Sequence, residues 1–123
     1  MTPTEPTEVT ERVRAICLGF PESAERVSHG APGFFVKKQF VMLWPQGHHG
    51  RDEPHLWAAA AAGVQAEVVG DDPERFFVPP YVGGRGWVGM RLDGDVDWDE
   101  VAEICEDAYR QIAPPRLLRG LDR

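Results

Sequence analysis

The sequence predicts a two-layer α+β domain, in which an antiparallel sheet carries helices on one face in the order α-β(3)-α-β(2)-α. Two observations support this prediction. Apolar residues recur with the 3.6-residue period of a helix near both ends of the chain. Between them lie short apolar runs, separated by glycine, proline and polar residues, as is typical of strands joined by turns. Helices packed on one face of such a sheet form a two-layer domain.

The first helix is predicted from apolar residues that share one helical face: Val9, Val13, Ile16 and Cys17. Residues 1–6 precede it and contain two prolines, so we expect a disordered lead-in there. Thr7 is expected to cap the helix, and Gly19 is expected to end it. Residues 21–27 are charged and show no clear pattern.

Strands are expected over the apolar runs of residues 34–36, 40–44, 55–59, 76–78 and 87–92. The first two runs flank the polar segment Lys37–Gln39, which predicts a hairpin turn. Residues 60–69 predict a short helix that ends at Gly70. Glycines at positions 83, 84 and 86 predict a turn before the last strand.

The last helix begins at a capping box of Asp97 and Glu100 and ends before Pro114. Its apolar face consists of Trp98, Val101, Cys105, Ala108 and Ile112. Because Cys17 and Cys105 both fall on apolar helix faces, we expect two buried free thiols rather than a disulfide. The predicted domain therefore spans residues 7–119, and residues 120–123 form a tail.

Length and charge narrow the class of protein. A chain of 123 residues fits one domain, and no apolar run approaches the roughly 20 residues of a membrane helix. The polar N-terminus lacks the pattern of a signal peptide, so we expect a cytoplasmic protein that is not bound to a membrane. A net charge of −7 disfavours general nucleic-acid binding. The charge is uneven, however: residues 75–91 hold three arginines and no acid, whereas residues 93–107 hold eight acids and no base.

Three segments resemble, in the correct order, the signatures of the MmcQ/YjbR family. Residues 29–34 (HGAPGF) look like its HGxPxF motif, and residues 75–81 (RFFVPPY) with 86–88 (GWV) resemble its second signature. Residues 108–109 (AY) with 113–117 (APPRL) resemble the third, in which Pro115 replaces a usual lysine. The resemblance implies the α-β(3)-α-β(2)-α fold. It also implies a role in DNA binding. Members of the family are labelled DNA-binding chiefly because their surface is predicted to resemble a double-wing binding surface.

Basic and aromatic residues in the predicted turns are the candidate binding residues. In wings that contact nucleic acid, Lys and Arg reach phosphates and an aromatic ring stacks on a base. We therefore expect nucleic-acid contacts from Lys37, Lys38, Arg85, Trp87 and Arg116. The alternative is that the lysines only solubilise a turn while Trp87 packs in the core.

The remaining polar residues are expected to be structural. The loop of residues 48–55 holds three histidines and two carboxylates, but their spacing matches no metal-binding pattern, so we expect a solvated loop and no metal. His29 could act as a general base, yet no nucleophile can be placed beside it, so we expect it to order a turn. Residues 93–107 are expected to form a solvated helical face, and the aromatic residues at strand positions are expected to fill the core.

The sequence thus favours a small binding domain, without catalytic residues or a cofactor, whose partner is DNA by family resemblance. The alternative is a protein-interaction module, including a homodimer, that pairs through a sheet face or edge. A metal-binding or enzymatic protein that uses His29 or residues 48–55 is the third hypothesis.

Overall fold

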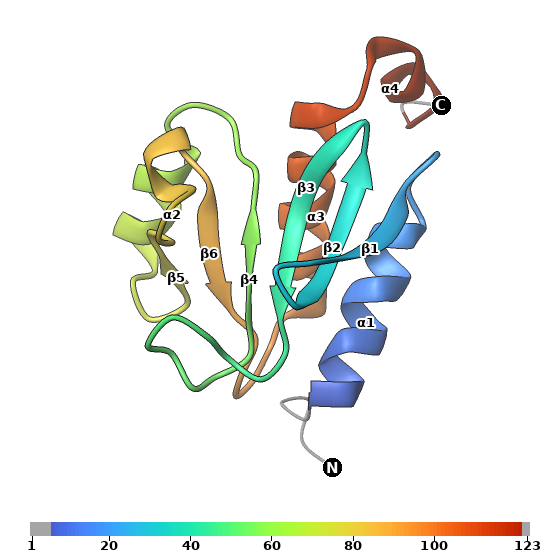
Figure 1. Ribbon diagram of the computed structural model, residues 1–123. Helices are drawn as coiled ribbons and strands as arrows, with labels where there is room; N and C mark the ends of the chain where they lie inside the picture. Colours follow the sequence, from blue (N-terminus) through green and yellow to red (C-terminus); the bar gives the residue numbers. More distant parts are fainter. Residues whose placement is uncertain (1–5, 122–123) are drawn as a thin grey trace.

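Six strands form one antiparallel sheet in the computed structural model, in the order β1-β2-β3-β4-β6-β5 (Figure 1). The structure describes residues 6–121. The strands are β1 (Ala24–Ser28), β2 (Ala31–Val36), β3 (Lys38–Trp44), β4 (His55–Ala58), β5 (Phe76–Phe77) and β6 (Val88–Arg91). The helices of the described region are α1 (Pro6–Leu18), α2 (Val64–Asp71), α3 (Trp98–Ile112) and α4 (Pro115–Leu121), with a short 3₁₀ turn, η1 (Gly83–Arg85).

Helices α1 and α3 pack against each other and against one face of the sheet, while α2 lies next to the edge strand β5 (Figure 1). The predicted α+β class, with helices on an antiparallel sheet, is therefore confirmed. The core lies between this helical layer and the sheet. It contains Val9 and Val13 of α1, Val101 and Cys105 of α3, and Phe40 of β3, all fully buried.

A β-bulge between β2 and β3 sets which side chains of β3 face the helices. The register shifts between Phe34 and Phe35, and both Phe40 and Val41 are fully buried. Beyond the bulge, side chains alternate between the two faces of the sheet. Met42 and Trp44 therefore project away from α1 and α3, and this second face is covered by loops rather than by helices.

Strand β1 was not predicted, so four strands precede α2 instead of three. Its burial pattern is mostly exposed, and Val27 is 80% exposed, so the segment lacks the apolar alternation of a typical strand. It is held by its pairing with β2 and by an ion pair between Arg14 of α1 and Glu25, with Nε and Oε1 2.6 Å apart. Pairing of the backbone, rather than apolar burial, makes this segment a strand.

The ends of the helices differ from the prediction in three places. Helix α2 begins at Val64 and continues through Gly70 to Asp71, whereas residues 60–69 were expected, with Gly70 as the end. Helix α1 begins at Pro6, so Thr7 lies in its first turn and does not cap it. Pro115 was expected to follow the last helix, but it begins α4, because proline fits the first position of a helix. Residues 1–5 of the expected lead-in lie outside the described residues. Of the expected tail, Gly120 and Leu121 belong to α4, and residues 122–123 are also outside the described range.

Two other local predictions are confirmed. The Asp97 side chain caps α3 by accepting hydrogen bonds from the backbone N–H groups of Asp99 and Glu100, at 3.0 and 3.2 Å. Cys17 and Cys105 are free thiols, both fully buried in the core. Burial, together with the neighbouring Cys105 thiol, raises the pKa of Cys17 well above its usual value, so this thiol stays protonated and unreactive.

Candidate functional site

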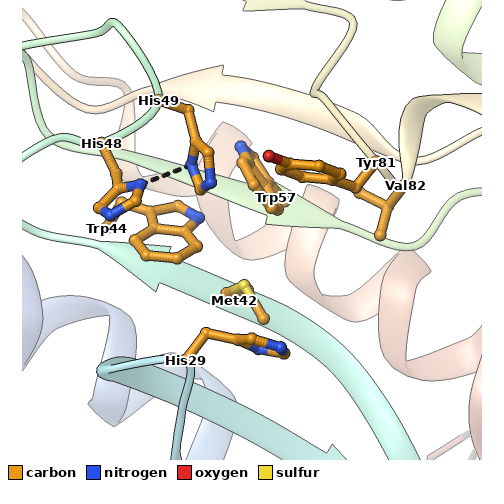
Figure 2. A pocket seen from close by; sticks show the side chains of 8 residues that line it. All are labelled: His29, Met42, Trp44, His48, His49, Trp57, Tyr81 and Val82. Carbon is orange, nitrogen blue, oxygen red and sulfur yellow. Dashed lines mark hydrogen bonds between the residues drawn. The ribbon is translucent and has the colours of Figure 1, made fainter.

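The candidate site lies on the face of the sheet that α1 and α3 leave uncovered. Its floor consists of Met42 and Trp44 of β3 and Trp57 of β4 (Figure 2). Met42 and Trp57 are direct partners across the two strands, and the rings of Trp44 and Trp57 lie 5.1 Å apart. All three side chains are buried, and the other residues that line this cavity with them come from loops. Loops must therefore provide the cover.

Three loops close around this floor and leave a cavity of about 390 Å³. The first is the turn between β1 and β2, the second is the turn at residues 47–50, and the third follows Pro80. The cavity is lined by His29, Met42, Trp44, His48, His49, Trp57, Tyr81 and Val82 (Figure 2). The lining is mainly aromatic, which suits a flat ligand.

A second cavity, of about 320 Å³, adjoins the first and is basic. The two cavities share His29, Met42, Trp57 and Val82. The second is also lined by Lys38, Gln39, Arg85, Trp87 and Ile112. We call the two together the cleft. Among residues 6–121, no carboxylate lines it.

The cleft brings together three of the residues predicted to bind nucleic acid: Lys38, Arg85 and Trp87. The Arg85 guanidinium lies over the Trp87 ring, 5.3 Å from its centre. Gln65 of α2 fixes the η1 turn that carries Arg85, because its side-chain amide donates to the carbonyls of Gly83 and Trp87 at 2.8 and 2.7 Å. Trp87 is only 6% exposed, so it packs in the core and lines the cleft at once.

The other two predicted residues lie outside the lining of the cleft. Lys37 is exposed in the turn between β2 and β3, with φ of 65°. Arg116 lies on α4 and forms a two-pronged ion pair with Glu22, with N–O distances of 2.8 and 3.0 Å. That hydrogen bonding lowers the pKa of the exposed Glu22 carboxyl. Arg116 is thus occupied by an acid, whereas Lys38 and Arg85 face an acid-free cavity.

His29 has the structural role that was expected of it and also borders the cleft. His29 and Gly30 are the two central residues of the β1–β2 hairpin, with φ of 54° and 79°. Two successive positive φ values are required by the tight turn that matches the twist of paired strands. The ring bonds locally, with Nδ1 3.1 Å from the Ser28 hydroxyl. The first two residues of the HGxPxF motif are therefore explained by turn geometry.

The histidine loop is only partly the solvated loop that was expected. His48 and His49 are exposed, but their rings lie over the aromatic floor, and His48 stacks on Trp44 with ring centres 4.7 Å apart. His55 belongs to β4 and is buried. Within the described part of the chain, no three His, Cys, Asp or Glu side chains are grouped as metal ligands would be. Sequence reasoning missed His49 and Tyr81 as neighbours in one site.

Burial of His55 makes the stability of the fold depend on pH. Its Nδ1 lies 2.9 Å from the Glu53 carbonyl, so Nδ1 carries the proton and donates it. Nε2 is buried without a hydrogen-bond partner among residues 6–121, so a second proton there would be unsolvated. Burial accordingly lowers the pKa of His55 below its usual value.

We expect the free energy of unfolding to fall as the pH drops from 7 to 5. With a lowered pKa in the folded state, protonation favours the unfolded chain, whose histidines titrate near pH 6.5. The contribution is complete above that pH and is lost as the pH falls through the folded-state pKa. In urea titrations at pH 7 and 5, His55→Asn should lose most of this dependence, because asparagine keeps a donor for Glu53 but does not titrate.

His49→Asn is the matched control, because partial desolvation and the neighbouring His48 also lower the pKa of His49. It should remove a smaller part of the pH dependence, since His49 is exposed. The carboxyls with a lowered pKa, such as Glu25 and Asp93, titrate below this range. An unchanged slope in His55→Asn would contradict this account of His55.

Fold and cleft together define a small α+β domain with a preformed concave site. The sequence model of the YjbR family matches residues 18–111, and the chain belongs to the YjbR family. The fold is similar to the crystal structure of Deinococcus radiodurans protein DR2400, which has a DUF419 domain, with a TM-score of 0.73. That similarity covers 97% of this chain and 91% of that chain at 16% sequence identity, and it concerns the fold alone.

No curated protein matches the chain. None of the helices in the described region is long and apolar enough to cross a membrane.

Proposed function

We propose that this YjbR domain binds single-stranded nucleic acid in the cleft. In this proposal Lys38 and Arg85 hold phosphates, and the aromatic cavity takes a base. The observation that supports it is the contrast between a protein of net charge −7 and a cleft lined by two cations and, among the described residues, by no carboxylate.

The positive charge of the cleft favours a negatively charged ligand. Phosphates are bound by Lys and Arg, and a carboxylate beside them would cancel the attraction. The acids of residues 93–107 belong to α3 and the loop before it, and none of them lines the cleft. An anion can therefore approach this site although the protein as a whole has a net charge of −7.

The shape of the cleft favours an unpaired base. In a duplex the faces of the bases are stacked on one another, so a concave aromatic site cannot reach them. Bases of a single strand are free to stack on aromatic side chains. Trp44, Trp57 and Tyr81 offer such rings within one cavity.

The test is fluorescence anisotropy with labelled single-stranded and duplex DNA of one sequence, titrated across salt concentration. We expect tighter binding of the single strand. Its log K should fall with log salt at a slope of about −1.4, as for two phosphates contacted in a single strand. Absence of binding at low salt, or preference for the duplex, would overturn the proposal.

Strand β1 provides a second candidate function, as a homodimer that pairs through a sheet edge. β1 is the terminal strand of the sheet, and Val27 on it is 80% exposed. An open strand edge is a template for pairing with another chain. Sedimentation at high protein concentration should then show a dimer that Val27→Lys weakens, and a monomer at all concentrations excludes this function.

A further inference from the structure

The imidazole of His49 lies among the rings of Trp44, Trp57 and Tyr81 in the first cavity of the cleft. We call these three rings the aromatic box. The ring centre of His49 lies 5.1 Å from Trp44, 5.1 Å from Trp57 and 5.3 Å from Tyr81 (Figure 2). These are the distances of stacked and edge-to-face aromatic pairs. A flat heteroaromatic ring is thus held on several sides, and that ring belongs to the chain itself.

Hydrogen bonding inside this box is incomplete. The indole N–H groups of Trp44 and Trp57 are buried and have no acceptor among residues 6–121. Figure 2 shows both indole nitrogens on the sides of their rings turned toward His49. The Nδ1 atom of His49 is engaged elsewhere, since it lies 2.8 Å from Nδ1 of His48. A buried donor without a partner destabilises the state that leaves it unpaired.

The turn that carries His49 has an unusual backbone conformation. Gly47, His49 and Gly50 all have positive φ, at 78°, 54° and 83°. The turn is closed by an isolated bridge between His48 and Arg51, and residues 48–50 are exposed. Apart from the ring contacts of its histidines, the turn is closed by backbone hydrogen bonds from Gly47 N–H to the Trp44 carbonyl at 3.2 Å and from Arg51 N–H to the His48 carbonyl at 3.1 Å. Opening it therefore breaks less structure than opening the sheet beneath it.

We propose that His49 plugs the base site and that a nucleobase with carbonyl oxygens displaces it. The base would stack in the box of Trp44, Trp57 and Tyr81, and its oxygens would accept hydrogen bonds from the two indole N–H groups. This proposal rests on the proposed function and adds a class of base to it. Thymine and uracil carry such oxygens at two ring positions, whereas adenine carries none.

If His49 plugs the site, removal of its ring should strengthen binding, which is unusual for a residue that lines a binding site. Because the base binds only molecules whose turn is open, the apparent affinity equals the intrinsic affinity multiplied by the fraction of molecules that are open. His49→Asn removes the ring, and asparagine tolerates the positive φ. We expect this variant to bind oligo(dT) about five- to tenfold more tightly than the unsubstituted protein.

His29→Asn is the matched control, because His29 has the same φ of 54°, lines the same cavity and does not lie in the box. It should not tighten binding. The unsubstituted protein should also prefer oligo(dT) over oligo(dA), and Trp57→Phe should reduce this preference while leaving the salt dependence in place. Melting curves of each variant establish that it is folded.

The outcomes separate this inference from the proposed function. Salt-dependent oligonucleotide binding with equal affinity in His49→Asn and the unsubstituted protein overturns the plug and leaves the binding function standing. Equal affinity for oligo(dT) and oligo(dA) overturns the class of base. No binding of any oligonucleotide by any of the proteins overturns both proposals.

Discussion

Replacement of Tyr109 by alanine is expected to lower the free energy of unfolding by about 3–5 kcal/mol. Tyr109 of α3 is fully buried. Its ring centre lies 4.9 Å from Phe20 and 5.5 Å from Phe40, so it connects the helical layer to the loop after α1 and to the sheet. The alanine variant would leave a cavity among these rings, and urea denaturation measures the loss.

The Tyr109→Phe variant separates the contribution of the Tyr109 ring to stability from that of its hydroxyl group. The hydroxyl donates a hydrogen bond to the carbonyl of Pro21 at 2.7 Å and so ties α3 to a segment 88 residues away in the chain. Its removal leaves a carbonyl without this partner and should cost about 1 kcal/mol. A loss below about 1 kcal/mol in Tyr109→Ala would contradict the view that Tyr109 links the two layers.

Reversal of charge at Lys38 and Arg85 is expected to weaken the binding of single-stranded DNA at least tenfold at low salt, roughly the effect of losing two phosphate contacts. The double variant Lys38→Glu with Arg85→Glu places two acids in the cleft. The slope of log K against log salt should become shallower by about 1.4. Anisotropy titrations at several salt concentrations measure both quantities.

Lys37→Glu is the control for this variant. It makes the same change of charge as Lys38→Glu alone, one residue away, on a side chain that is exposed but does not line the cleft. Its effect should stay below about threefold, which is the size expected of a screened surface charge. Equal weakening by Lys37→Glu and by Lys38→Glu would mean that charge near the turn, and not the cleft, controls binding.

Periodicity was enough to predict the helices and strands that bury a continuous apolar face. Helix α3 is the clearest example, because its period, its cap at Asp97 and its end all agree. Strand β1 could not be found in this way, since an exposed edge strand is defined by backbone pairing with β2. Helix α4 was missed because Pro115 can either end a helix or begin one.

The site could be predicted only in part for a similar reason. Lys38, Arg85 and Trp87 were recognised as turn residues of the right chemistry, and the fold brings them into one cleft. His49 and Tyr81 belong to loops that are distant in sequence, and they meet only because both fold over the same face of the sheet. No local sequence pattern indicates that these two loops come together, so their contact could be found only from the structure.

The central claim is that single-stranded nucleic acid enters the cleft on the open face of the sheet. The most direct test follows the indole N–H signals of the four tryptophans by ¹⁵N–¹H NMR while oligo(dT) is added. Trp44, Trp57 and Trp87 line the cleft, whereas Trp98 begins α3 and lies under Arg12 of α1. We expect the first three signals to move and that of Trp98 to stay. Movement of Trp98 alone, or of none of the four in a sample that binds DNA, would contradict it.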